Sequence, residues 1–351
     1  MEKKIRVLVV DDSKYVVVTV TKKLQCDRNI EVIGSAGNGR EAVEKVKTLR
    51  PDVVTMDIVM PEMDGLAALE KIMAECPTPV VMLSALTSAN AEPTIRALQL
   101  GAVDFYLKPS AIKPVGAGPE DDELINKVKT AASSHINGKE DNPEMPAEQP
   151  KVNRPNLEQR TKFNKLVVIG SSTGGPRALM QVVPYLPADL PAAVLIVQHM
   201  PPVFTRSLAE RMAAASKIEV LEAKEGSQLA RGRALLAPGD FHMQVNDKHC
   251  VTLNQEAPNL GVRPCVDYCM QSAASVFGSS VLGVILTGMG QDGTQGARAI
   301  KGRGGRIFAQ DEATCAVYGM PQAVYKAGYV DKVYPIHRLA QKITDACANQ
   351  E

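Results

Sequence analysis

Short apolar runs that alternate with amphipathic segments constrain the fold of this chain more than any other feature. In the first 130 or so residues, runs rich in Val and Ile indicate strands at residues 5–10, 30–34, 53–57, 80–83 and 105–107. Helical patterns follow them at residues 15–25, 40–49, 66–75, 93–100 and 120–132. Because these strands lack clean polar alternation, both faces of their sheet are expected to be covered by helices. The alternation predicts a doubly wound, parallel α/β sheet.

A second α/β pattern begins at residue 165. Its strand candidates lie at residues 166–169, 193–197, 233–237, 281–287 and 306–309. Residues 218–222 and 248–253 are expected to form further strands outside this simple alternation. The stretch 135–164 between the two blocks holds four prolines and many charges without apolar periodicity, which is typical of an exposed linker. The fold class is therefore α/β, with two doubly wound parallel-sheet domains.

The charge balance argues against two classes of partner. The chain has 40 basic and 39 acidic side chains, for a formal net charge of +1. This balance does not favour nucleic acid or an anionic membrane as the main partner. The sequence also lacks an apolar run of about 18 residues, so membrane insertion is not expected.

Cysteine usage and the first strand bear on the compartment. The seven cysteines are scattered without a CxxC pair, which indicates neither a disulfide framework nor a zinc cluster. Cys265 and Cys269 would share one face of a helix, and they are expected to be small core residues. The apolar run at residues 7–10 is too short for a signal peptide and is followed by two aspartates. A cytoplasmic location is expected.

Polar side chains gather at the ends of the strands in the first block. Asp11 and Asp12 follow the first strand, and Asp57 ends the third. Ser84 and Lys108 follow the fourth and fifth strands. Because the carboxyl ends of parallel strands meet at one edge, these groups are expected to lie together. Carboxylates there suit Mg²⁺, while an ammonium and a hydroxyl suit phosphoryl oxygens. The set predicts phosphoryl transfer to a carboxylate.

Taken singly, these residues have simpler interpretations. Asp11 and Asp12 alone would favour capping of the helix that starts near Ser13, and Lys108 alone would favour a solvated surface lysine. Their combination at four strand ends favours a site. The motifs VDDSK, TMDIVMPEMDG, MLSAL and YLKPS that hold them resemble the two-component receiver domain, over residues 1 to about 130.

The receiver resemblance implies a role for each residue at this edge. It implies a flavodoxin-like fold with Asp57 as the phosphoacceptor and with Asp11, Asp12 and Asp57 as partners of Mg²⁺. Ser84 and Lys108 would sense the phosphoryl group. The family also has an aromatic side chain near the fifth strand that reorients on activation. Phe105 lies at about that place, although it is equally compatible with an ordinary core role.

The first strand of the second block runs into a glycine-rich turn, GSSTGGP. Residues 170–174 fit G-x-S-x-G centred on Ser172, a pattern that exposes a serine at a sharp strand-to-helix turn. Pro176 suits the first turn of a helix, whose N-terminus favours developing negative charge. A turn of this kind can instead hold a phosphate or nucleotide. It lacks the G-x-G-x-x-G spacing and the P-loop lysine, which disfavours that alternative.

A serine nucleophile needs a base, and His199 is the candidate. It follows the strand at residues 193–197, in VQHMPP. That strand comes directly after the strand that ends at the serine, so both residues are expected at one sheet edge. A histidine at a strand end is often structural, but its expected neighbour Ser172 favours a catalytic role.

The third member of a triad should be an acid that orients the imidazole. Asp292 lies in GMGQDG, just after the strand at residues 281–287 and before a helical stretch. Capping of that helix is the alternative role, and the two do not exclude each other. The backbone N–H groups of Gly288, Met289 and Gly290 are expected to suit an oxyanion hole.

The motifs GSSTGGP, VQHMPP, APGDFHM and TGMGQDG resemble the catalytic half of the chemotaxis protein-glutamate methylesterase (CheB) family. The resemblance implies a Rossmann-like serine hydrolase domain in which Ser172 is the nucleophile, His199 the base and Asp292 its orienter. The backbone of Met289 would donate to the oxyanion. Ser171 stands where alanine is expected, which leaves a second hydroxyl beside the nucleophile.

The two resemblances together imply a domain order and a function. Residues 1–134 would form a receiver domain, 135–164 a linker and 165–351 a methylesterase domain. The expected reaction is hydrolysis of glutamate γ-methyl esters on methyl-accepting chemotaxis receptors, with deamidation of receptor glutamines as a second activity. A chemotaxis histidine kinase would be the phosphodonor, and the hydrolase domain would need no cofactor. The unphosphorylated receiver is expected to inhibit the hydrolase. The rival interpretation is a receiver joined to a non-catalytic binding module.

Overall fold

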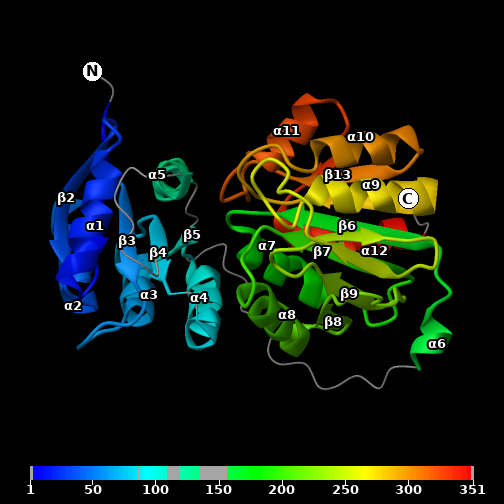
Figure 1. The fold of residues 1–351 in the computed structure, drawn as a ribbon, viewed down its shortest axis with the longest axis horizontal. Helices are drawn as coiled ribbons and strands as arrows, with labels where there is room; N and C mark the ends of the chain where they lie inside the picture. The colour runs from blue at the N-terminus through cyan, green and yellow to red at the C-terminus, as the bar shows by residue number, and fades with distance from the viewer. Residues whose placement is uncertain (1–2, 86, 109–118, 135–155, 349–351) are drawn as a thin grey trace. The chain divides into compact units, whose positions relative to one another are not determined.

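The structure is a computed structural model that describes residues 3–85, 87–108, 119–134 and 156–348. Most of the predicted linker, residues 135–155, lies outside this described part. The chain divides into two compact units, Met1–Asn142 and Pro143–Glu351, and each has its own parallel sheet (Figure 1). None of the helices in the described part has the length and apolar character needed to cross a membrane.

The first unit is built on a five-stranded parallel sheet in the order β2-β1-β3-β4-β5. This is the flavodoxin-like order, as expected. The strands are β1 (Ile5–Val10), β2 (Ile30–Ala36), β3 (Val53–Asp57), β4 (Val80–Ser84) and β5 (Asp104–Leu107). Side chains of β1, β3 and β4 are almost fully buried, because helices cover both faces of the sheet.

In the described part of the first unit, five helices complete the fold (Figure 1). They are α1 (Lys14–Gln25), α2 (Gly39–Leu49), α3 (Gly65–Glu75), α4 (Ser88–Leu100) and α5 (Pro119–Ala132). Helices α1 and α5 pack together, and α2, α3 and α4 form a second neighbouring set. Helix α4 begins earlier than the predicted residue 93, because the Thr87 hydroxyl accepts the Asn90 N–H at its N-terminus. Pro93 is accommodated inside the helix.

The second unit holds a seven-stranded sheet in the order β14-β13-β12-β6-β7-β9-β8, and all its strand pairs are parallel. The strands are β6 (Lys165–Ser171), β7 (Ala192–Gln198), β8 (Glu219–Glu222), β9 (Arg233–Leu236), β12 (Val281–Ile285), β13 (Arg306–Gln310) and β14 (Lys332–Tyr334). The central strands β6, β7 and β12 are buried along almost their whole length. The expected doubly wound α/β architecture is confirmed.

Helices lie on both faces of this sheet (Figure 1). They are α7 (Gly175–Val182), α8 (Phe204–Ala215), α9 (Val266–Phe277), α10 (Thr294–Gly302), α11 (Met320–Lys326) and α12 (Ile336–Cys347). Helices α9, α10 and α11 form one layer, while α7, α8 and α12 lie on the other side. Cys265 and Cys269 are fully buried where α9 joins the core, as predicted.

The strand order of the second unit reverses beside β6. The chain passes from β6 to β7 on one side, and β12 later pairs with the other side of β6. In open α/β sheets, ligands bind outside the carboxyl ends of the strands at such a reversal. The turn after β6 and the loop after β12 meet at this point, since the Ser172 N–H donates to the Thr287 carbonyl at 3.0 Å.

Three strands of the second unit differ from the predictions: one has a different place, and two, β10 (His242–Val245) and β14, were not predicted. The strand expected at residues 218–222 is β8, which lies in the main sheet beside β9 rather than outside the alternation. The strand expected at 248–253 is β11 (Val251–Asn254), which pairs antiparallel with β10 (His242–Val245) outside the main sheet, as expected. Strand β14 was not predicted, because its three residues are largely exposed and lack an apolar run.

The end of the predicted linker packs against the second unit. Residues 157–160 form the short helix α6 (Leu157–Arg160), and Arg160 is only 7% exposed. Its guanidinium lies 2.5 Å from Glu219, which also bonds Arg233. The Phe163 ring stacks on Phe277 at a centroid distance of 5.7 Å. Arg160 and Phe163 are therefore packed against the second unit, while Glu158, Gln159 and Lys162 are exposed.

Candidate functional site

The structure brings four of the predicted groups together at the carboxyl edge of the first sheet. Lys108 Nζ lies 2.7 Å from Asp11 Oδ2 and 2.8 Å from Asp57 Oδ1. Asp11, Asp12 and Asp57 each offer an oxygen, and these atoms all lie within 4.8 Å of one another. Asp11 and Asp57 are buried, while Asp12 is exposed. The grouping predicted from strand order is thus present.

Backbone and charge contacts hold this cluster in place. Asp57 Oδ1 accepts the Ile58 N–H at 2.8 Å, and Asp11 Oδ1 accepts the Ser13 N–H at 2.9 Å. Burial raises the pKa of Asp57, and the contact with Lys108 limits the rise. Burial opposes the charge of Lys108, but its bonds to Asp11 and Asp57 raise the pKa of its ammonium. Lys108 therefore stays a cation through neutral pH.

The donor set of this cluster fits Mg²⁺. Asp11, Asp12 and Asp57 supply only oxygen atoms, which this hard cation prefers, and the exposed side of Asp12 leaves room for water ligands. Three carboxylates face one ammonium, so the cluster favours added positive charge. It is an acidic cluster typical of a Mg²⁺ site.

Ser84 differs from the expectation that its hydroxyl faces this cluster. Its Oγ lies 2.8 Å from Thr94 Oγ1 on α4. The Thr94 hydroxyl donates to the Asn90 carbonyl at 2.6 Å, so Ser84 donates to Thr94. Its other contact, with the Ala85 carbonyl, is long at 3.4 Å. Phe105 is buried, which agrees with an ordinary role in the core.

In the second unit, G-x-S-x-G forms the predicted strand–turn–helix. Strand β6 ends at Ser171 and α7 begins at Gly175. Between them Gly174 has φ of +75°, a conformation that disfavours other residues. A Cβ atom at Gly174 would lie only 2.6 Å from the Ala316 Cβ. The turn exposes Ser172 in part at the N-terminus of α7.

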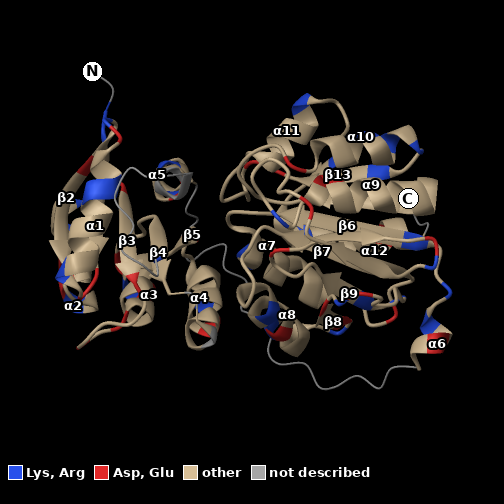
Figure 2. Cartoon of the chain, viewed as in Figure 1, with Lys and Arg blue, Asp and Glu red and all other residues tan. Residues whose placement is uncertain are grey.

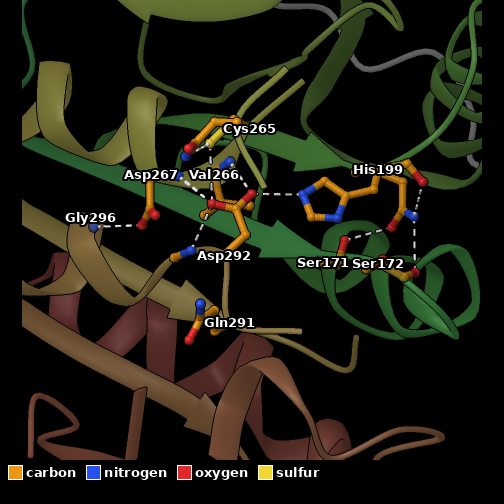
Figure 3. Close-up of polar contacts among 12 residues, drawn as sticks. Ser171, Ser172, His199, Cys265, Val266, Asp267, Gln291, Asp292 and Gly296 are labelled. Atoms are coloured by element: carbon orange, nitrogen blue, oxygen red, sulfur yellow. Dashed lines mark hydrogen bonds and ion pairs between the residues drawn. The ribbon is translucent and has the colours of Figure 1, made fainter. Parts of the chain in front are cut away.

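The two neighbouring serines have different environments (Figure 3). Ser171 is fully buried, and its hydroxyl donates to Gln198 Oε1 at 2.7 Å. Gln198 Nε2 donates in turn to the carbonyls of Ser172 at 2.9 Å and His199 at 3.1 Å. Gln198 therefore ties the ends of β6 and β7 together through the Ser171 hydroxyl. The Ser172 side chain remains on the accessible side of the turn.

His199 and Asp292 form the hydrogen bond that a triad requires. His199 Nε2 lies 2.8 Å from Asp292 Oδ2, and their side chains are 10% and 3% exposed. The other ring nitrogen, Nδ1, faces the side of Ser171 and Ser172 in Figure 3. Among the described residues, Ser172 Oγ has no hydrogen bond to His199; such bonds are often long before substrate binds.

The carboxylate of Asp292 receives several donors besides His199 (Figure 3). Oδ2 accepts the Val266 N–H at 2.7 Å. Oδ1 accepts the N–H groups of Asp267 and Gly293, both at 2.9 Å, and the Cys265 thiol at 3.2 Å. The carboxylate thus lies at the N-terminus of α9, where partial positive charge favours an anion. It does not cap α10, whose N-cap residue is Gly293.

These contacts keep Asp292 ionised. Burial opposes its charge, but the hydrogen bonds from His199, Val266 and Asp267 hold the pKa of its carboxyl below the usual value. Asp267 behaves differently. Burial raises its pKa to about 6, a bond from the Gly296 N–H limits the rise, and the charge of Asp292 adds to it. The ionised carboxylate that faces His199 is therefore Asp292.

A buried trio of possible metal ligands surrounds Asp292, since Cys265, Asp267 and Asp292 each offer an atom within 4.8 Å of the others. Both oxygens of Asp292 already accept N–H or S–H donors. Burial, with the charge of Asp292, raises the pKa of Cys265 to about 12, whereas a metal would require the thiolate. This donor set suits a hydrogen-bonded carboxylate rather than a metal.

The loop after β12 lies directly against the serine turn. A Cβ atom at Gly288 would lie 2.8 Å from the Ser172 Cβ, so glycine permits the close approach. The Gly288 N–H, one of the three predicted oxyanion donors, instead donates to the Val317 carbonyl at 3.0 Å. The next residue, Met289, has a side chain that is 46% exposed.

Sequence reasoning missed three residues that build this site: Gln198, Cys265 and Asp267. Gln198 directly precedes His199 at a strand end, and that position was an available signal. The other two lie at the start of α9, and Cys265 is 27 positions from Asp292. No local pattern links them, since only the packing of α9 beside β12 brings them together.

The two units together define a class: a response regulator whose receiver domain is followed by an α/β hydrolase domain. The response regulator receiver domain family matches residues 7–115, and the CheB methylesterase family matches residues 167–343. The chain belongs to the CheB methylesterase family. A receiver domain implies a histidine kinase as phosphodonor, and a methylesterase domain implies methylated receptor substrates.

Similar proteins support this membership over the whole chain. A protein-glutamate methylesterase/protein-glutamine glutaminase of Symbiobacterium thermophilum is 46% identical to this chain. The matched region covers 99% of this chain and 98% of that protein. The protein of the same name from Pyrococcus abyssi is 44% identical, and the matched region covers 98% of this chain and 94% of that protein. The crystal structure of the Thermotoga maritima CheB methylesterase catalytic domain is 43% identical with a TM-score of 0.51. It covers 53% of this chain and 100% of that domain.

Proposed function

We propose that this chain is a phosphorylation-regulated protein-glutamate methylesterase. It hydrolyses γ-methyl esters of glutamate on methyl-accepting chemotaxis receptors and releases methanol. The observation that carries the proposal is the 2.8 Å bond between His199 and Asp292, beside the turn that holds the partly exposed Ser172. Its location at the reversal of strand order supports a substrate site there. The names of the similar proteins support this substrate class.

In the proposed reaction, Ser172 is the nucleophile and His199 the general base. Because Asp292 accepts from Nε2, the neutral imidazole carries its proton there and its Nδ1 lone pair is available to Ser172. Nδ1 takes the hydroxyl proton as Oγ attacks the ester carbonyl. The carboxylate of Asp292 stabilises the imidazolium that forms.

The remaining steps regenerate the enzyme. The backbone N–H of Met289 stabilises the oxyanion, a role supported by the close contact of Gly288 with Ser172. His199 returns its proton to the leaving methoxy group, so methanol departs and an acyl-enzyme remains. Water then gives a proton to His199 and attacks the acyl group, and His199 passes this proton to Ser172 Oγ as the glutamate carboxylate leaves, which restores both residues. A glutamine substrate would follow the same steps with ammonia as the leaving group.

Methanol release from methylated receptor tests the hydrolase directly. Wild-type protein should release methanol, and Ser172→Ala should reduce the rate by about three orders of magnitude or more. The rival function, a non-catalytic binding module, predicts no methanol from either protein. Full activity in Ser172→Ala would instead reject Ser172 as the nucleophile.

The receiver site supports a role in control. Asp57 is proposed as the phosphoacceptor, with a chemotaxis histidine kinase as donor. Asp11, Asp12 and Asp57 would hold Mg²⁺, which supplies positive charge for the phosphoryl oxygens. Lys108 adds a second positive group to this site. Ser84 would donate to a phosphoryl oxygen once it leaves Thr94.

We further propose that the unphosphorylated receiver domain, residues 1–134, restrains the methylesterase domain, and that phosphorylation relieves the restraint. The packing of Arg160 and Phe163 supports a methylesterase domain that starts near residue 156 rather than 165. A protein of residues 155–351 should therefore be more active than the unphosphorylated full chain. Equal or lower activity would contradict the restraint.

Partners and location follow from the same proposal. Basic and acidic residues are interspersed along the elements of both units (Figure 2), and the net charge is +1, so nucleic acid is not a proposed partner. All seven cysteines are free, which favours a reducing compartment such as the cytoplasm. The mean hydropathy of −0.09 is ordinary for a protein without membrane insertion.

A further inference from the structure

We infer that Cys265 is a positioning residue for the catalytic acid, because its thiol donates to Asp292 Oδ1 and fixes the carboxylate that orients His199. This inference rests on the proposed function. The Cys265 Sγ lies 3.2 Å from Asp292 Oδ1, and the cysteine is fully buried. Cys265 is the N-cap residue of α9, and its side chain makes no capping hydrogen bond to that helix.

The direction of this hydrogen bond is fixed by the chemistry of its two groups. An ionised carboxylate can only accept, and burial keeps the Cys265 thiol protonated by raising its pKa to about 12. Asn259 Nδ2 donates to the same sulfur at 3.1 Å. The sulfur thus accepts from Asn259 and donates to Asp292, which extends the polar chain of the site from His199 to a surface loop.

The thiol acts on the oxygen of Asp292 that does not face the imidazole. Oδ2 bonds His199 and the Val266 N–H, while Oδ1 bonds the thiol and the N–H groups of Asp267 and Gly293. Within the described part of the chain, Cys265 and His199 are the side chains that hydrogen-bond this carboxylate. The other donors to Oδ1 are backbone N–H groups. The thiol is therefore the donor to this oxygen that a side-chain substitution can remove.

Loss of the thiol donor should also leave less of His199 in the neutral form that acts as the base. With fewer donors, Asp292 would direct more negative charge to the imidazole and hold its protonated form more tightly. The titratable groups around Asp292 in the described structure are His199 after β7, and Asp267, Cys265 and Cys269 at the start of α9. Helix α10 contributes backbone N–H groups. The acidic limb of the pH–rate profile should therefore move to higher pH.

Cys269 provides a matched control. It lies one turn further along the same helix and is fully buried, like Cys265. Among the described contacts its thiol makes no hydrogen bond to Asp292. Cys269→Ala therefore removes the same atom from the same core and leaves the donors of Asp292 unchanged.

The test measures kcat and KM of methanol release by the full-length chain over a range of pH, with methylated receptor and acetyl phosphate. Cys265→Ala should lower kcat about tenfold, with KM unchanged and the acidic limb moved to higher pH. Cys265→Ser keeps a donor and should restore most of kcat. Cys269→Ala should match the wild type in both kcat and profile.

Two further variants keep the outcomes distinct. Asn259→Ala, at a half-buried loop position, removes the group that aligns the thiol and should lower kcat by about threefold even if Cys265→Ala fails to fold. The inference is overturned if Cys265→Ala or Asn259→Ala keeps the wild-type kcat and profile, or if folded Cys265→Ser is as impaired as Cys265→Ala. Absence of methanol release by the wild-type protein would instead overturn the proposed function.

Discussion

His199 Nε2 lies 2.8 Å from Asp292 Oδ2, although 93 positions separate the two residues in the chain. The contact joins the loop after β7 to the loop after β12, on either side of the strand that ends at the serine turn. In the proposed reaction the imidazole proton lies on Nε2, which leaves Nδ1 for Ser172. The order Ser, His, Asp along the chain differs from that of chymotrypsin, subtilisin and the α/β hydrolases.

Asp292→Asn should lower kcat by about three to four orders of magnitude. The amide presents two N–H donors where the carboxylate accepts from His199 and from the backbone of α9. It would therefore favour the wrong imidazole tautomer and lose the stabilisation of the imidazolium. Methanol release at saturating substrate measures the effect, and a rate within threefold of wild type would contradict the role of Asp292.

Ser171→Ala should retain activity within about fivefold of wild type, because the buried Ser171 hydroxyl bonds Gln198 and not substrate. The change leaves Gln198 Oε1 without its donor, which should destabilise the fold by about 1–2 kcal/mol. Thermal unfolding and methanol release separate the two effects. An inactive but folded Ser171→Ala, beside an active Ser172→Ala, would reverse the assignment of the nucleophile.

Glu219→Gln should destabilise the methylesterase unit at neutral pH by about 1–3 kcal/mol, because the buried Arg160 and Arg233 lose their anion. Burial opposes the charge of Glu219, but bonds from Arg233 and Arg160 hold its pKa below the unfolded value of 4.5. The stabilisation is therefore fully present above about pH 4.5 and is lost as the pH falls through the lower folded pKa.

Urea unfolding of wild type and Glu219→Gln at several pH values measures this dependence. The difference in unfolding free energy should be largest near pH 7 and shrink below pH 4. Glu210→Gln is a suitable control, since Glu210 forms an exposed pair with Arg206 on α8. A difference between wild type and Glu219→Gln that is constant with pH would contradict the role of the ion pairs.

Thr94→Val should increase phosphorylation of Asp57 at a given acetyl phosphate concentration. The Ser84 hydroxyl has one proton, which it gives to Thr94 and would need for a phosphoryl oxygen. Removal of the Thr94 acceptor should shift the equilibrium by up to about fivefold toward the phosphorylated form, because this is the effect expected from the net free energy of one hydrogen bond. Thr94→Ser keeps the acceptor and should resemble wild type. Equal phosphorylation of all three proteins would contradict this competition.

Positions that follow from strand order could be predicted from the sequence. Asp11, Asp57 and Lys108 end or follow strands of one parallel sheet, so topology alone brings them to one edge. His199 follows the strand that pairs with the one ending in Ser171, and the same reasoning applies to it.

Side-chain directions and long-range packing could not be predicted in this way. Ser84 is at the predicted strand end, but its hydroxyl direction depends on the local competition with Thr94. The donors to Asp292 come from the start of α9, which no periodicity connects to the loop after β12. The receiver and methylesterase motifs predict the reacting groups, whereas the contacts that orient them depend on the folded structure.

Phosphorylation of Asp57 is proposed to control the chemistry of Ser172. Methanol release from methylated receptor, with and without acetyl phosphate in the presence of Mg²⁺, tests it in wild type, Asp57→Asn and Ser172→Ala. Acetyl phosphate should raise the wild-type rate severalfold, leave Asp57→Asn at its basal rate and produce no methanol with Ser172→Ala. Equal stimulation of Asp57→Asn and wild type, or wild-type release by Ser172→Ala, would contradict the claim.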